Sequence, residues 1–326
     1  MEVSVVVPAR NAGATIGACL QSLLAQREAP AGYEVIVVDD GSTDDTRHAV
    51  EAHGIALISQ PHEGPAAARN RGVAAASGEI VLFTDADCVP DEVWVREMVR
   101  PLEDPEIVGV KGVYRTRQQG IIPRFVQCEY EERYELMGRH KWIDFIDTYS
   151  AAYRREVFLA QGGFDIGYPS ASVEDQELSF RLAEQGYKMV FNPRAVVYHQ
   201  HPETLTAYLS RKFNIGCWKV RVLRRHPGKA MQDSHTPQTL KIQMVLAMVL
   251  VPLLALVLLR SFFCSLVLLI LVLFFISAIP FAIRALRKDP TVGLLSPFLL
   301  FVRALALGLG MAKGSWDAAF RGQVMS

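Results

Sequence analysis

Cysteine is scarce in this sequence, and no two cysteines form a recognisable pair. The chain has 326 residues and only five cysteines, none of them in a C-x-x-C arrangement. Their scatter and odd number exclude a zinc-ligand pattern and fit a reducing compartment. No secretory signal is expected either, because Met1–Pro8 has no basic start and its apolar run is too short. The five positions are Cys19, Cys88, Cys128, Cys217 and Cys264.

Charge is scarce from residue 240 onward, although both signs are mixed with apolar residues before about residue 235. The runs 240–259 and 262–283 each approach the roughly 20 apolar residues that cross a bilayer. A buried soluble hairpin is disfavoured, since soluble cores rarely contain so long an uncharged run. A third run, 292–312, contains Arg303, which is costly in lipid unless it faces a partner or water. This run can span, re-enter or lie in the interface, and we favour a span.

Basic residues lie before the first apolar run and after the second, whereas the turn between the two runs holds Arg260 alone. Because positively charged loops stay in the cytoplasm, residues 1–239 are expected on the cytoplasmic face of the inner membrane. The basic residues before the first run are Arg211, Lys212, Lys219, Arg221, Arg224, Arg225 and Lys229, and those after the second run are Arg284, Arg287 and Lys288.

Short apolar runs alternate with helical periodicity in the first 200 residues. This alternation predicts an α/β fold with a doubly wound, mostly parallel sheet. No G-x-G-x-x-G follows the first strand, which argues against a dinucleotide-binding oxidoreductase. Residues 115–147 give no clear assignment. The expected strands are 3–7, 34–38, 56–59, 80–83, 108–114, 188–191 and 195–198, and the expected helices are 16–24, 46–52, 64–76 and 173–182.

Aspartates follow two of these strands, Asp39 and Asp40 after one and Asp85 and Asp87 after the other. Ligands of such sheets bind outside the carboxyl ends of the strands. Asp85 and Asp87 are one residue apart and could together hold a divalent cation that bridges two phosphates. The alternative is an ordinary turn, where aspartate is common.

Two further segments have open interpretations. Glu174 and Asp175 begin the expected helix 173–182, where carboxylates also simply stabilise the helix dipole. The stretch Leu205–Arg225 mixes aromatic and basic residues, which suits a helix lying in the lipid headgroup region. A merely solvated basic face is the alternative.

Five separated motifs together resemble glycosyltransferase family 2, and the resemblance covers roughly residues 2–205. It implies the GT-A fold, which is a Rossmann-like α/β domain, and a hexosyltransferase that inverts the anomeric carbon. The motifs are Asp39-Asp40-Gly41-Ser42, Ala68-Arg69-Asn70-Arg71-Gly72, Asp85-Ala86-Asp87, Gly162-Gly163-Phe164-Asp165 and Glu174-Asp175.

The resemblance assigns roles to individual residues. Asp175, with Glu174 beside it, matches the base that activates the acceptor. Asp87 matches the metal ligand, Asp85 contacts ribose or metal, and His199 is a weaker metal candidate, since a turn histidine is as often structural. Asp40 matches the carboxylate that binds the pyrimidine ring. The expected nucleotide-binding set is Pro8, Arg10, Asn11, Asp39, Asp40, Arg69 and Asp85, and the expected acceptor or interface set is Arg211, Lys212 and Trp218.

These residues imply an enzyme that uses Mn²⁺ or Mg²⁺ and a nucleotide-sugar, with a UDP-sugar favoured. The expected partners are membrane lipids and a lipid-linked or glycan acceptor, with no nucleic acid. The Gln-x-x-Arg-Trp motif of processive synthases is missing near 211–218, so transfer of a single sugar in cell-envelope glycan synthesis is expected. A polysaccharide synthase subunit and an inactive membrane scaffold are the alternatives. The expected domains are 1–205, 206–239 and 240–326.

Overall fold

The computed structural model describes residues 1–168, 173–257, 259–260 and 262–320. The chain divides into two compact units. The first contains residues 1–117, 134–200 and 233–235, and the second contains residues 118–133, 201–232 and 236 onward.

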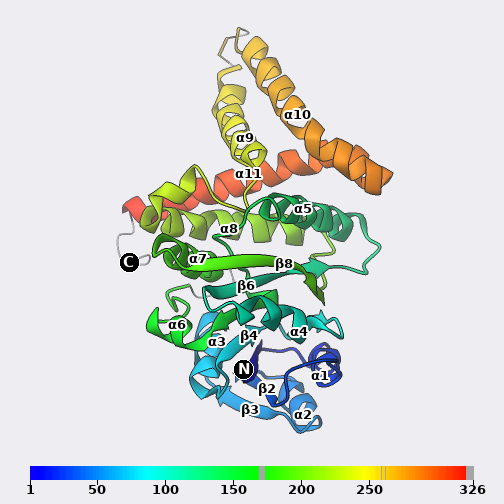
Figure 1. Cartoon of the computed structure of the whole chain (residues 1–326). Coiled ribbons are helices and arrows are strands. Elements are labelled where there is room, and N and C mark those ends of the chain that lie inside the picture. The colour runs from blue at the N-terminus through cyan, green and yellow to red at the C-terminus, as the bar shows by residue number, and fades with distance from the viewer. Residues whose placement is uncertain (169–172, 258, 261, 321–326) are drawn as a thin grey trace. The chain divides into compact units, whose positions relative to one another are not determined.

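The first unit begins with strands and helices that alternate along the chain (Figure 1). They are β1 Val3–Ala9, α1 Ile16–Leu24, β2 Tyr33–Asp40, α2 Thr46–Glu51, β3 Ala56–Gln60, α3 Pro65–Ala75 and β4 Ile80–Phe83. β1 pairs in parallel with both β2 and β4, and β3 pairs in parallel with β2. A helix joins consecutive strands because parallel neighbours need a crossover connection.

The second half of the sheet is mixed in direction. Its elements are β5 Val89–Pro90, α4 Trp94–Val99, the 3₁₀ turn η1 Arg100–Glu103, β6 Ile107–Arg115, α5 Ile121–Met137, η2 Thr148–Ser150, β7 Ala151–Arg154, α6 Arg155–Ala160, α7 Glu174–Glu184 and β8 Lys188–Tyr198. β7 is antiparallel to β4 and β6, while β8 is parallel to β6. Among the described residues the strand order is β3-β2-β1-β4-β7-β6-β8-β5. The predicted α/β fold of the GT-A kind is therefore confirmed.

The central strand β4 is buried at all four residues, which is typical of a strand covered on both faces. Phe83 at its end packs against Phe158 and Phe164, with ring centroids 5.5 and 5.4 Å away. Burial of these aromatic rings fixes the end of β4, and the site residues follow directly after it.

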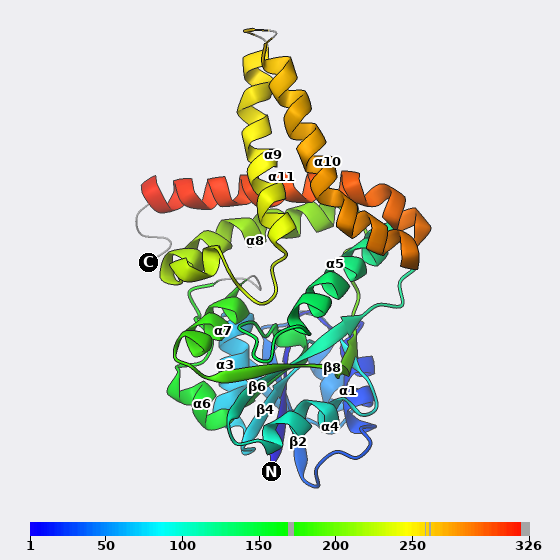
Figure 2. The ribbon, with the colours of Figure 1, turned by 45° about the horizontal axis from the view of Figure 1, so that its top comes forward.

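The second unit is helical. Besides residues 121–133 of α5 it contains α8 Leu205–Arg225, η3 Pro227–Ala230, α9 Gln238–Val257, α10 Phe263–Lys288 and α11 Pro290–Phe320. By length and composition α9, α10 and α11 are each able to cross a membrane, and they overlap the three predicted apolar runs. α9 and α10 form a hairpin, and α11 runs crosswise to it in both views (Figures 1 and 2).

Two predictions about elements need correction. The two short strands expected at 188–191 and 195–198 are one strand, β8. Its pairing register with β6 shifts between Lys111 and Val113, so the strand accommodates Pro193 without ending. The unassigned region 115–147 contains the long helix α5, whose many charged residues obscured its periodicity.

Candidate active site

The loop after β1 is held against the loop after β2 by hydrogen bonds. The backbone N–H of Asn11 donates to Ser42 Oγ over 2.9 Å, and Asn11 Oδ1 accepts from the N–H of Thr43 over 2.9 Å. Asn11 has a φ of 49°, in the left-handed region where asparagine is tolerated. Arg10 Nη1 lies 2.9 Å from His62 Nε2. Two of the predicted nucleotide-binding residues, Arg10 and Asn11, therefore lie in a loop that is fixed by hydrogen bonds.

Asp39 and Asp40 are buried at the end of β2. Asp39 accepts from the N–H of Ser42 and from Arg47. Both carboxylate oxygens of Asp40 accept hydrogen bonds from residues 60–64, at the end of β3 and directly after it. Burial alone would raise the pKa of Asp40, but these hydrogen bonds hold it below its ordinary value. The predicted contact between Asp40 and a pyrimidine ring remains a prediction. The donors to Asp40 are the N–H groups of Glu63 and Gly64, the amide of Gln60 and the ring of His62.

Arg69 joins two of the predicted acidic residues. Its buried guanidinium donates to Asp85 Oδ1 over 2.8 Å and to Glu174 Oε1 over 3.2 Å. This pairing connects α3, the end of β4 and the start of α7. The geometry supports an organising role for Arg69, which holds the two carboxylates in place, more directly than the predicted nucleotide contact.

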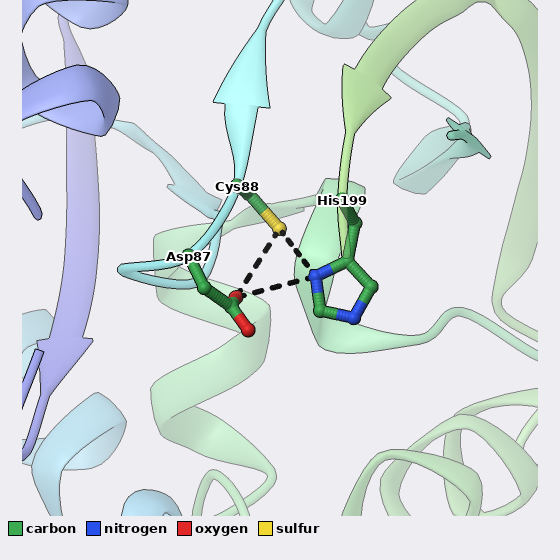
Figure 3. Close-up of side chains that lie close together, drawn as sticks. All are labelled: Asp87, Cys88 and His199. Atoms are coloured by element: carbon green, nitrogen blue, oxygen red, sulfur yellow. Dashed lines mark hydrogen bonds and ion pairs between the residues drawn. The ribbon is translucent and has the colours of Figure 1, made fainter. Parts of the chain in front are cut away.

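Asp87, Cys88 and His199 gather where the chain leaves β4 and β8 (Figure 3). His199 Nδ1 lies 3.3 Å from Asp87 Oδ1, and Cys88 Sγ lies 3.8 Å from each of these two atoms. The ring of Tyr114 stacks on His199 with centroids 4.6 Å apart, which fixes the imidazole plane. A carboxylate oxygen and an imidazole nitrogen fit a divalent cation such as Mn²⁺.

Cys88 is the member of this group that sequence reasoning missed. Burial, and then the negative charges of Asp85 and Asp87, raise the pKa of its thiol well above the usual value. A neutral thiol is a poor ligand for hard cations, so Asp87 and His199 are the better candidates to hold one. The only signal in the sequence was its position directly after Asp87.

Asp175 lies in the first turn of α7, where the N–H of Gln176 donates to its Oδ1 over 2.7 Å. Burial, and then the negative charges of Glu174 and Asp147, raise its pKa well above the usual value. The helix dipole acting alone would lower the pKa of a carboxylate at this position. A raised pKa is typical of a general base in an enzyme site.

One of the carboxylates near Asp175, that of Asp147, is paired with a buried lysine. Lys111 on β6 donates to Asp147 and, over 2.9 Å, to the hydroxyl of Tyr149. Tyr149 in turn lies 3.1 Å from the hydroxyl of Tyr134. Sequence reasoning missed this network because Asp147 and Tyr134 fall in the region left unassigned. The lysine inside an otherwise apolar strand was the available signal.

The predicted interface residues lie on α8 in the second unit. Arg211 is exposed and Trp218 is half-buried. Lys212 instead points inward and lies 3.1 Å from Glu129 of α5. Burial lowers the pKa of Lys212 to about 8, although Glu129 opposes this shift. Lys212 therefore has a partner inside the helical unit.

Residues 4–160 match the family model described as glycosyl transferase family 2. The chain is 31% identical over 241 residues to a pre-mycofactocin glycosyltransferase of Mycobacterium tuberculosis, covering 70% of this chain and 49% of that protein. It thus spans about half the length of the first curated relatives that it matches.

Two solved structures share the fold. A mannosyltransferase of Pyrobaculum calidifontis in complex with GDP-Man and Mn²⁺ has a TM-score of 0.61 at 25% identity, covering 97% of this chain and 87% of that one. A glucosyl-3-phosphoglycerate synthase of M. tuberculosis in complex with Mn²⁺, UDP-Glc and phosphoglyceric acid has a TM-score of 0.50 at 25% identity, covering 68% of this chain and 79% of that one.

Proposed function

Because this chain belongs to glycosyltransferase family 2, we propose that it transfers a single sugar from a nucleotide-sugar to an acceptor at a membrane surface. The observation that supports this most is the approach of His199 to Asp87 over 3.3 Å. These residues leave two different strands of the sheet, and together they offer the oxygen and nitrogen atoms that a divalent cation needs.

The cation would be held by Asp87 and His199, and both solved relatives contain Mn²⁺. Once bound, it would neutralise the charge that develops on the departing nucleoside diphosphate. The imidazole nitrogen favours Mn²⁺ over Mg²⁺, which prefers oxygen ligands alone.

Asp175 acts as the base in this proposal. The acceptor hydroxyl attacks the anomeric carbon of the donor, and its proton passes to a carboxylate oxygen of Asp175. The bond from the anomeric carbon to the diphosphate breaks on the opposite face, so the configuration inverts. Glu174 stays paired with Arg69 and helps to fix the start of α7.

The acceptor in this proposal is a lipid-linked sugar or glycan on the cytoplasmic leaflet. Within the part of the chain that the structure describes, three helices are long and apolar enough to cross a membrane. An anchored enzyme meets lipid carriers at a high effective concentration. Excess basic residues next to the hairpin support a cytoplasmic catalytic unit. We expect a UDP-sugar as donor, with a GDP-sugar as the competing choice.

Nucleotide binding to the purified full-length chain tests the proposal. We expect UDP-sugars to raise the melting temperature in the presence of Mn²⁺ and to lose this effect with a chelator. Asp87→Ala should weaken nucleotide binding at least tenfold, whereas Glu156→Gln, which changes an exposed carboxylate on α6, should leave it unchanged. If Asp87→Ala binds the nucleotide as tightly as wild type with Mn²⁺ present, and a chelator still weakens that binding, the metal assignment is wrong.

Release of nucleoside diphosphate separates the remaining alternatives. Mn²⁺-dependent release from one donor supports an enzyme, whereas no release from any common UDP-, GDP-, CDP- or dTDP-sugar favours a scaffold. If radiolabelled product grows by more than one sugar, the chain acts as a polysaccharide synthase subunit and the single-transfer proposal is wrong.

A further inference from the structure

α11 packs against α8 so closely that their backbones touch. A Cβ atom added to Gly310 would lie 2.1 Å from the carbonyl oxygen of Phe213, and one added to Gly314 would lie 2.3 Å from that of Cys217. On α8, a Cβ at Gly216 would lie 2.4 Å from the carbonyl oxygen of Leu307. Glycines four residues apart permit this close approach between helices. The C-terminal half of α11 is therefore fixed to α8.

α8 itself does not suit the hydrocarbon core of a bilayer. Its 21 residues include six basic ones, and a basic side chain is costly at the centre of a spanning helix. A helix fixed along α8 shares its depth, so this contact keeps α11 out of the hydrocarbon core. The basic residues are Arg211, Lys212, Lys219, Arg221, Arg224 and Arg225.

The first half of α11 is held at the same level by α5. Asp289, directly before α11, accepts from Arg124, and Arg303 in mid-helix donates to Glu129 over 2.7 Å. At about 1.5 Å per residue, Asp289 and Arg303 are about 21 Å apart along α11, but their partners are only about 8 Å apart along α5. Arg303 also donates to Gln243 near the start of α9, over 2.8 Å. If α11 crossed the bilayer, Asp289 and Arg303 would lie at different depths, whereas their partners on α5 lie close together.

The outer face of α11 is apolar. Its exposed large apolar side chains fall within a stripe about 100° wide, at about 100° per residue. Arg303, Gly310 and Gly314 are buried on the opposite face. α11 also runs crosswise to the α9–α10 hairpin in both views (Figures 1 and 2). The stripe consists of Leu294, Leu295, Phe298, Leu309, Trp316 and Phe320, which are 78, 39, 57, 44, 62 and 69% exposed.

We propose that α8 and α11 form a platform that lies in the headgroup region of the bilayer, with the apolar stripe of α11 on the acyl chains. The chain then crosses the membrane twice, through α9 and α10, and residue 320 ends on the same side as residue 238. A lipid surface is the expected occupant of the stripe because the exposed apolar side chains of α9 and α10 need lipid as well.

Reporters of membrane side test the number of crossings in the full chain. Epitope tags are placed before Met1, beside Arg260 in the turn between α9 and α10, and after Ser326. We expect the two terminal tags on one side of sealed vesicles and the Arg260 tag on the other. Terminal tags on opposite sides would show three crossings and overturn the proposal.

Spin-label depth measurements test the platform directly. Labels are attached to cysteines introduced at Leu294 or Leu309 of α11, in a background with Cys128→Ser and Cys264→Ser. We expect depths equal to within a few ångströms, whereas a spanning helix would separate them by about 22 Å. Labels at Ile242 and Leu254 of α9 are the control, with an expected difference of about 18 Å.

The same labels identify the occupant of the stripe. Lipid contact at Leu309 supports the proposal. Spin–spin coupling between two copies, with no lipid contact, would show that a second chain covers the stripe and would overturn the choice of lipid. Neither readout requires catalysis, so a failure of the proposed sugar transfer leaves this test valid.

Discussion

At the scale of single residues, Asp175 lies in an environment that disfavours the negatively charged form of its side chain. Burial and the carboxylates of Glu174 and Asp147 raise its pKa, whereas the N–H of Gln176 and the charge of Arg69 oppose this only in part. Sequence reasoning identified this residue from its motif. The motif did not reveal the raised pKa, which depends on Asp147 from a segment left unassigned.

We predict that Asp175→Asn lowers the turnover number by about 10²–10⁴-fold and leaves donor binding nearly unchanged. Because only the deprotonated carboxylate accepts a proton, the wild-type kcat/KM should rise with pH through the raised pKa. Rates measured over pH 5 to 9, with nucleotide binding measured in parallel, provide the check. Simultaneous loss of turnover and donor binding would contradict the role of a base.

The raised pKa of Asp175 also leads to a prediction about stability. Since its pKa is higher in the folded chain than in the unfolded chain, wild-type stability falls as pH rises from the ordinary aspartate pKa through the raised one. Asp175→Asn removes this loss, so the variant should melt a few degrees above wild type at neutral pH. The difference in melting temperature should shrink towards pH 4, and a constant difference would contradict it.

Lys111 and Asp147 form a buried ion pair whose members depend on each other. Lys111→Met leaves Asp147 without its cation, and we expect a loss of about 3–5 kcal/mol in the free energy of unfolding. The double variant Lys111→Met, Asp147→Leu should recover much of that loss, as measured by denaturant titration. Lys188→Met, which breaks an exposed pair with Glu106, is the matched control and should cost about 1 kcal/mol or less.

At the scale of elements, periodic apolar patterns predicted most of the first unit. β1, α1, β2 and β4 match their predicted segments closely, since each has a strong local pattern. α5 was missed because its charged residues find partners more than 150 positions away in the chain. Glu132, for example, pairs with Arg284, and Glu131 pairs with Lys288. A pairing of that kind leaves no trace in local periodicity.

The contact between α8 and α11 depends on glycine. Gly310→Ala places a methyl group against the carbonyl oxygen of Phe213, so the helices must separate, at a cost of about 1–3 kcal/mol. We expect a lower melting temperature in detergent and more proteolysis within the helical unit. Gly228→Ala is the control, because nothing lies within 4 Å of its added Cβ. If both variants melt like wild type, the close contact does not exist in solution.

At the scale of the whole molecule, a formal net charge of zero conceals how unevenly charge is buried. In the helical unit, Glu129 of α5 pairs with Arg303 of α11 and Lys212 of α8, and all three are buried. Burial by itself would raise the pKa of Glu129, but these cations lower it to about 2. One carboxylate therefore connects three helices that are far apart in the sequence, which composition could not show.

We predict that Glu129→Gln destabilises the helical unit by about 3–5 kcal/mol, because two buried cations lose their counter-charge. Glu131→Gln, which affects the more exposed pair with Lys288 on the same helix, should cost about 1 kcal/mol or less. As pH falls from the ordinary glutamate pKa of 4.5 to about 2, the wild type should lose the contribution of Glu129 and the variant should not. Thermal unfolding in lipid nanodiscs measures both differences. If Glu129→Gln and Glu131→Gln melt alike, Glu129 does not hold the three helices together.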